Sequence, residues 1–121
     1  MLSEPLIDHT QIALLRRALG DEDLRDMLAE LPEVARQGLD KIRAAVAASD
    51  LDEARRNGHA LKGVASSFGA ARIAAEARKI EAAGSSIAAI SQGVALLERL
   101  IDETAVALAE LCPASAEATS P

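Results

Sequence analysis

The stretch DEDLRDMLAELPEVARQGLDKIRAAVAA, residues 21–48, decides the fold class. Apolar side chains recur in it every three or four residues, which places them on one face of an α-helix. The stripe comprises Leu24, Met27, Leu28, Leu31, Val34, Ala35, Leu39, Ile42 and Val46. Pro32 lies inside the stripe and removes one helical hydrogen bond, but the stripe keeps its phase across it. We therefore predict one long, kinked amphipathic helix over residues 21–48.

Segments on either side of this stretch have the same helical period. They cover about residues 6–19, 51–67, 70–83 and 87–111. Glycines follow three of them at the position where helices commonly end. Four substantial helices with short connections predict an all-α fold, an antiparallel four-helix bundle with a short N-terminal helix as a cap. We expect one domain over residues 1–111 and a disordered tail over 112–121, where no apolar stripe remains.

The composition excludes several kinds of protein. Trp and Tyr are absent and Phe68 is the only aromatic residue, which excludes a β-sandwich and disfavours nucleic-acid binding by base stacking. With 13 basic and 19 acidic side chains, the net charge of −6 has the wrong sign for a nucleic-acid partner. No apolar run reaches the roughly 18 to 20 residues that span a membrane. The first residues lack an export signal and the lone Cys112 forms no internal disulfide, so we expect a cytoplasmic protein with no membrane contact.

Residues 54–68 form a helix whose exposed face is unusual. At about 100° per residue, one side of it carries the apolar residues Ala54, Leu61, Ala65 and Phe68. His59 lies at the centre of the opposite side. Within about 60° of it are Arg55, Arg56, Lys62, Gly63 and Ser66. We therefore expect an exposed histidine rather than a core one.

The neighbours of His59 require an explanation. The face carries three positive charges and residues 54–68 contain no acid, although the whole chain is acidic. Lys62 follows His59 by three positions, so its ammonium lies within reach of anything attached to the ring. Gly63 follows by four, where glycine costs about 1 kcal/mol relative to alanine. An ordinary charged surface explains the cations, and close helix packing explains a glycine, but Gly63 points outward with the histidine.

Together these residues are suited to carrying a phosphoryl group. A neutral imidazole is a nucleophile near pH 7, and phosphoryl transfer requires in-line positioning and neutralised oxygens. Lys62 supplies a cation for those oxygens, with Arg55 and Arg56 helping a partner to approach. Gly63 leaves room for the partner's loops. The face has no clustered acids, so we expect no metal bound to this chain.

The segment His59-Ala-Leu-Lys62-Gly63, followed by Ser66-Ser-Phe-Gly69-Ala70, resembles the signature of the histidine-containing phosphotransfer (HPt) domain family. The resemblance covers about residues 6–111 and includes Asp8, the Ser49-Asp50 break and Ile80-Glu81. It implies a monomeric bundle that accepts a phosphoryl group on His59 from a receiver-domain aspartate and passes it to another receiver. The implied partners are receiver domains of hybrid sensor kinases and response regulators, which bring Mg²⁺. Leu31-Pro32 stands where many relatives have Phe, a departure that concerns the local packing and the bend rather than the site.

Several alternatives stay open beside this hypothesis. In the chemotaxis-kinase branch of the family, an acid at the position of Glu81 bonds to the histidine, so Glu81 either orients the ring of His59 or is an ordinary exposed or capping glutamate. The chain could be the phosphate-accepting substrate domain of such a kinase, although we expect that branch of the family to show further domains. It could also dock receivers without transfer. Autonomous kinase activity is disfavoured, because Ala60 replaces the acid of dimerisation-type kinases and no Gly-rich nucleotide segment exists.

Overall fold

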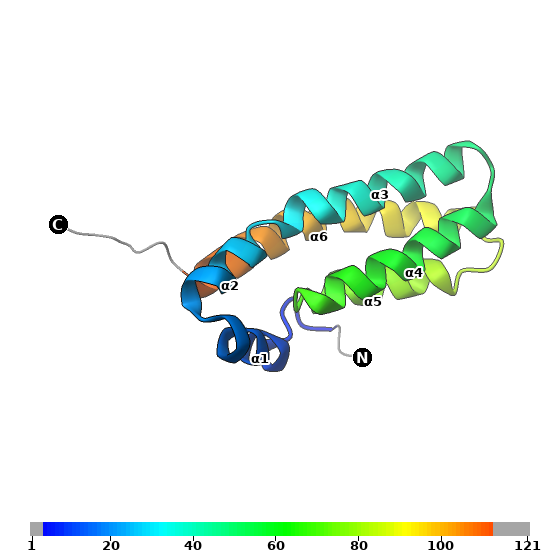
Figure 1. Ribbon diagram of the computed structural model, residues 1–121. Coiled ribbons are helices and arrows are strands. Elements are labelled where there is room, and N and C mark those ends of the chain that lie inside the picture. Colours follow the sequence, from blue (N-terminus) through cyan, green and yellow to red (C-terminus); the bar gives the residue numbers. More distant parts are fainter. Residues whose placement is uncertain (1–3, 113–121) are drawn as a thin grey trace.

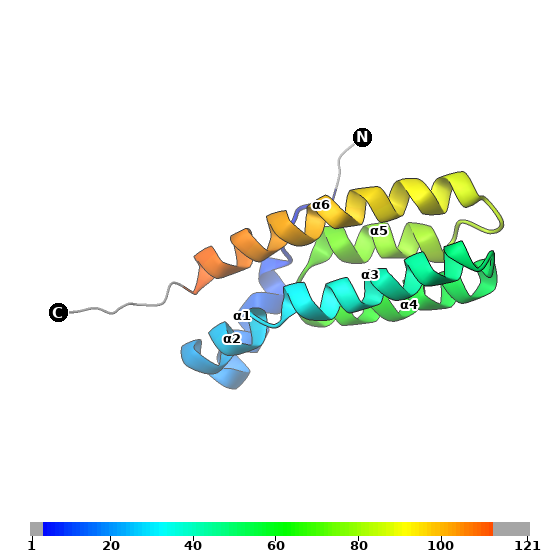
Figure 2. The same cartoon turned by 90° about the horizontal axis from the view of Figure 1, so that it is seen from above.

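The structure, a computed structural model, describes residues 4–112 and contains no strand within them. Its helices are α1 (His9–Leu19), α2 (Asp21–Leu28), α3 (Leu31–Ala47), α4 (Leu51–Ser67), α5 (Ala71–Glu81) and α6 (Ile87–Leu111). Helices α3 to α6 form a four-helix bundle in which α4 and α6 each pack against both α3 and α5 (Figure 1). Helix α1 crosses one end of the bundle (Figure 2). The predicted all-α, four-helix architecture with an N-terminal capping helix is confirmed.

The prediction of one continuous helix over residues 21–48 is wrong. The chain leaves the helical hydrogen-bonding pattern at Ala29 and Glu30, which separate α2 from α3. Pro32 lies in the first turn of α3, where its missing N–H has no helical acceptor to lose. Ala29 and Glu30 keep right-handed helical backbone angles, so α2 and α3 run one after the other along α6 (Figures 1 and 2). The apolar stripe stays in phase because the break interrupts the helical hydrogen bonds while the backbone keeps its helical angles.

The bundle is packed closely with aliphatic side chains and glycines. A Cβ added at Gly38 would lie 3.1 Å from Leu61 Cδ1, and one at Gly93 would lie 2.9 Å from Ile80 Cγ1. These glycines let α3 approach α4 and let α5 approach α6, which compensates for the scarcity of large side chains. Leu19 and Ile87, at the outer ends of their predicted stripes, are exposed because they lie in terminal turns.

Asp50 and Gly69 fix the two ends of α4. Asp50 caps the helix by accepting a hydrogen bond from the backbone N–H of Glu53 at 3.0 Å. Gly69 ends the turn after α4 with φ of 72°, and its carbonyl accepts from the N–H of Asp8 at 2.8 Å. Arg72 donates from Nε to the carbonyl of Glu4 at 2.8 Å. These bonds hold the N-terminal segment against the turn between α4 and α5.

The C-terminal boundary differs slightly from the expectation. Cys112 was predicted to begin a disordered tail, but its side chain is buried with the core. The rest of that tail, residues 113–121, lies outside the described residues. Within residues 4–112, no helix is both long and apolar enough to cross a membrane.

Candidate functional site

His59 lies in the middle of α4 with its ring directed to solvent. Its side chain is 65% exposed, whereas Ala54, Leu61 and Ala65 on the opposite side of the helix are buried. The predicted orientation of α4 is therefore confirmed. An exposed imidazole on a rigid helix is accessible to a macromolecular partner and is held by its backbone rather than by a flexible loop.

The ring of His59 is hydrogen-bonded to Glu81, the last residue of α5. Nδ1 of His59 lies 2.7 Å from Oε2 of Glu81. An ionised carboxylate can only accept a hydrogen bond, so Nδ1 is the nitrogen that carries the proton. The lone pair of the neutral ring is then on Nε2, which is the nucleophilic nitrogen. The sequence leaves open whether Glu81 orients the ring or is an ordinary exposed or capping glutamate. The structure shows the contact with the ring of His59.

The same carboxylate binds Lys62. Nζ of Lys62 lies 3.0 Å from Oε1 of Glu81, and both side chains are about one third exposed, at 31% and 33%. The hydrogen bond from Lys62 lowers the pKa of Glu81 below its usual value, and the bond from His59 lowers it further. Glu81 therefore holds the ring and the ammonium together on one face. The sequence predicted Lys62 beside His59 but missed its pairing with Glu81, because a helical wheel contains no information about another helix.

Gly58 explains why Glu81 reaches the histidine. A Cβ at residue 58 would lie 3.1 Å from the carbonyl oxygen of Ala77 and 3.2 Å from the backbone nitrogen of Glu81. Those contacts are tighter than normal packing allows, so glycine permits α5 to approach α4 at this level. Since His59 is the next residue, the close approach brings the end of α5 within hydrogen-bonding distance of the ring. Gly58 therefore serves the close packing of α4 against α5.

Gly63 differs from Gly58 in the space around its Cα. Its position is exposed, and a Cβ built there would meet nothing within 4 Å among the described residues. Packing within this part of the chain therefore does not require a glycine at residue 63. Ser66 is also exposed, nearly one turn further along the same face. Both positions are free for contact with a partner.

The two arginines predicted to assist docking are paired with their own acids. Arg56 binds Glu53 at 2.6 Å, and Arg55 binds Asp52. These four residues have no net charge, so the flank of His59 formed by α4's first two turns is less positive than residues 54–68 alone suggested. The sequence indicates these ion pairs, because each acid precedes its arginine by three positions. The segment 54–68, in which the charges are summed above, begins after both acids.

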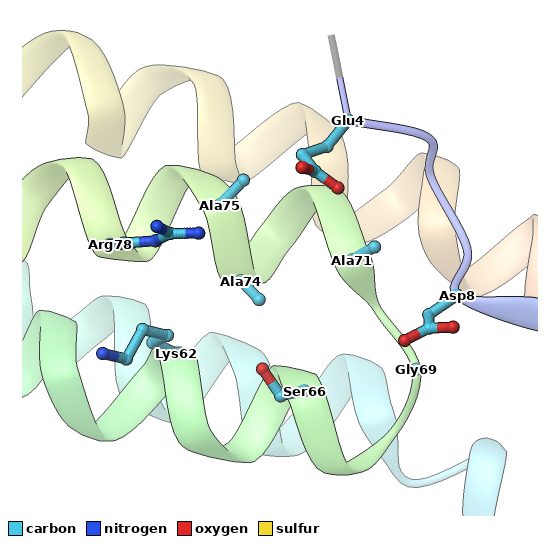
Figure 3. Close-up of a pocket in the computed structure, with 9 residues that line it drawn as sticks. All are labelled: Glu4, Asp8, Lys62, Ser66, Gly69, Ala71, Ala74, Ala75 and Arg78. Carbon is cyan, nitrogen blue, oxygen red and sulfur yellow. The ribbon is translucent and has the colours of Figure 1, made fainter. Parts of the chain in front are cut away.

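A groove runs between α4 and α5 on the opposite flank of His59. This α4–α5 groove has a volume of about 410 Å³, and Figure 3 shows the side chains around it. Its lining residues are Glu4, Asp8, Lys62, Ser66, Gly69, Ala71, Ala74, Ala75 and Arg78. Arg78, an exposed residue of α5, was not predicted, although it precedes Glu81 by nearly one helical turn. The groove is therefore polar at its ends and lined by small residues between them.

Within residues 4–112, no group of three or more His, Cys, Asp and Glu side chains is placed to hold a metal ion. The chemistry available to the described residues is that of an imidazole nucleophile, a carboxylate that orients it and an adjacent ammonium.

Comparisons with known proteins agree with this geometry. The family model of the Hpt domain matches residues 24–111, which include His59, Lys62, Gly63 and Glu81. The fold is similar to the crystal structure of histidine-containing phosphotransfer protein B from Pseudomonas aeruginosa PAO1, with a TM-score of 0.75 and 23% sequence identity. That match covers 90% of this chain and 96% of the other. The comparison with curated proteins found no match.

Proposed function

This chain belongs to the Hpt domain family, whose members work with receiver domains in phosphorelays, and we propose that His59 is its phosphorylated residue. In this proposal, His59 accepts a phosphoryl group from an aspartate of one receiver domain and passes it to an aspartate of another. The single observation that carries the proposal is the exposed ring whose Nδ1 is bonded to Glu81, which leaves Nε2 free as the nucleophile.

The transfer is a displacement at phosphorus. The lone pair on Nε2 of His59 attacks the aspartyl phosphate, an N–P bond forms, and the P–O bond breaks with its electron pair leaving on the receiver's carboxylate. The ring becomes positively charged while its proton stays on Nδ1. The carboxylate of Glu81, 2.7 Å from Nδ1, stabilises that charge and holds the ring in line. Transfer to the second receiver reverses these bond changes.

Lys62 assists by neutralising the phosphoryl oxygens. Its ammonium has three N–H donors, so it can keep its bond to Glu81 and still donate to a phosphoryl oxygen on the neighbouring ring. This arrangement supplies a positive charge without a mobile side chain having to be ordered during the reaction. Lys62 thus contacts the reacting group, whereas Glu81 acts through His59 and Lys62 as a positioning residue.

The remaining requirements are met by the partner. The open space at Gly63 and the exposed Ser66 leave room for the receiver's loops beside the ring. Mg²⁺ and the acids that bind it are supplied by the receiver, and this chain binds no cofactor. The receivers are those of hybrid sensor kinases and response regulators, and the chain acts as a monomer in the cytoplasm, without membrane or nucleic-acid partners. It is a phosphoryl carrier and has no kinase activity of its own.

Substitution of the histidine tests the proposal. We expect His59→Gln to abolish labelling by phosphorylated receiver domains while leaving the helical content and melting temperature close to those of the wild type, because the side chain is exposed. His9→Gln is a matched control, since His9 is also exposed and lies at the start of α1. Equal labelling of both variants would show that another residue accepts the phosphoryl group.

A second candidate function is favoured by one contact. The bond between Glu81 and His59 is the feature that the resemblance assigns to the chemotaxis-kinase branch, whose HPt domain is phosphorylated from ATP by a catalytic domain. Incubating the chain with ATP and the catalytic domain of a chemotaxis-type kinase distinguishes the two candidates. Labelling there, with no labelling by any phosphorylated receiver, would favour the kinase-substrate function.

A further inference from the structure

We propose that the α4–α5 groove binds a charged surface segment of the receiver domain and that Arg78 is a specificity-determining residue for this partner. The inference rests on the proposed function, because it concerns the partner that docks over His59. The occupant would place an acidic side chain against Arg78 and a basic one toward Glu4 and Asp8. Three observations support this proposal. The groove adjoins His59, its two ends carry opposite charges, and Arg78 makes no ion pair within residues 4–112.

The groove adjoins the reacting face. Lys62 lines the groove and also shares the carboxylate of Glu81 with His59, so one lysine side chain separates the groove from the ring. Ser66, nearly one turn beyond Gly63 on the exposed face of α4, lines it too. A receiver that covers His59 with its active-site loops therefore also extends over this groove.

The groove has opposite charges at its two ends. Figure 3 shows Arg78 and Lys62 at one end and Glu4 and Asp8 at the other. The acidic end is held in place, because Glu4 and Asp8 are bonded through their backbones to Arg72 and Gly69. Between the ends lie Ala71, Ala74 and Ala75, whose short side chains leave room for the apolar stems of a partner's side chains. A free anion suits this site poorly, because two carboxylates line it.

The charged side chain of Arg78 is exposed and available to a partner. It makes no ion pair with any residue in the described range 4–112, whereas Arg55 and Arg56 are paired with Asp52 and Glu53. An acid from the receiver can therefore bind Arg78 without breaking an existing pair, while the same acid at Arg56 would have to displace Glu53. Complementary charge of this kind affects the rate of encounter and the choice of partner.

Charge reversal at the two ends of the groove tests the inference. Each variant is mixed with a panel of purified receiver domains phosphorylated by acetyl phosphate, and transfer to His59 is measured at low salt. Each rate is divided by the rate at which phosphoramidate, a small donor that needs no docking surface, labels the same variant. We expect Arg78→Glu to lower this ratio about tenfold for the receiver that the wild type prefers. Raising the ionic strength should reduce the difference.

Two further variants serve as a control and as a second test of the groove. Arg99→Glu makes the same change of charge at an exposed position of α6, which packs against α3 and α5, and should behave as the wild type. The double variant Glu4→Lys with Arg78→Glu leaves one acidic and one basic side chain at each end (Figure 3), which cancels the polarity of the groove, and should reduce the preference for one receiver over another. Equal ratios for Arg78→Glu, Arg99→Glu and the wild type with every active receiver would overturn the inference. Failure of every receiver to label His59 in the wild type would instead contradict the proposed function.

Discussion

Oε2 of Glu81 lies 2.7 Å from Nδ1 of His59, although 22 positions separate the two residues in the chain. The contact joins the end of α5 to the middle of α4, and the other oxygen of the same carboxylate binds Lys62. One acid thereby determines which ring nitrogen is protonated and where the adjacent cation lies. The functional consequences of this arrangement can be tested by single substitutions.

Glu81→Gln should slow transfer without preventing it. The amide can still contact the ring, but it has no charge to stabilise the phosphorylated imidazolium or to hold Lys62, so we expect a rate loss of about tenfold to a hundredfold. The transfer rate should be measured against pH with a phosphorylated receiver. Glu81→Asp retains the charge on a shorter side chain and should recover part of the rate. A rate and pH profile identical to those of the wild type would show that the contact is only structural.

The stability of the domain should depend on pH through Glu81. Lys62 and His59 lower the pKa of Glu81 in the folded state, so the folded protein binds fewer protons at this site than the unfolded chain. The contribution is fully present above the unfolded glutamate pKa of about 4.3 and is lost as the pH falls through the lower folded pKa. Urea unfolding of the wild type and Glu81→Gln at pH 7 and pH 3 measures this. We expect the wild type to be the more stable at pH 7, and a gap that stays the same at pH 3 would contradict the assignment.

Lys62→Ala should slow transfer and preserve the helical content. The ammonium is held beside the ring by Glu81, and its removal leaves the phosphoryl oxygens without a neutralising cation from this chain. We expect a rate loss of about tenfold to a hundredfold, with circular dichroism unchanged. Lys41→Ala, at an exposed position on α3, is the control for loss of a lysine. An unchanged transfer rate for Lys62→Ala would remove Lys62 from the mechanism.

Alanine at the two glycines of α4 should have opposite effects on stability. Gly63→Ala places a methyl group in open space and gains helix propensity, so unfolding should require about 0.5–1 kcal/mol more free energy. Gly58→Ala forces a Cβ against the backbone of α5 and should destabilise the bundle by about 1–3 kcal/mol, less the same gain in propensity. Urea unfolding measures both changes.

Transfer rates distinguish the roles of the same two glycines. We expect Gly63→Ala to be stable but slow, because the added methyl group meets the receiver rather than this chain. Gly58→Ala should also be slow, through displacement of Glu81 from His59. A Gly63→Ala protein that transfers at the wild-type rate would show that the receiver does not approach α4 at this position.

The sequence predicted the parts of the fold that depend on one helix at a time. The apolar period located α4, and the wheel placed His59 opposite Ala54, Leu61 and Ala65. The break at Ala29 and Glu30 was missed, because a proline in the first turn of a new helix and a proline inside a bent one leave the same stripe.

Contacts between helices were harder to predict. The distance between α4 and α5 is set where Gly58 meets Ala77 and Glu81, and no periodic pattern states which residues of two helices lie at the same level. The family resemblance suggested Glu81 as a partner of His59. The bond between Glu81 and Lys62 and the groove beside Arg78 depend on the level at which α4 and α5 pack against each other. The ion pairs of Arg55 and Arg56, by contrast, were readable at a spacing of three residues.

The most direct test of phosphotransfer through His59 is to locate the phosphoryl group. The wild-type chain is incubated with phosphorylated receiver domains, and the modified nitrogen is identified by mass spectrometry and by ³¹P and ¹⁵N NMR. We predict one phosphoryl group on Nε2 of His59, which disappears when an unphosphorylated second receiver is added. A phosphoryl group on Nδ1, on another residue, or on none despite active receivers would contradict it.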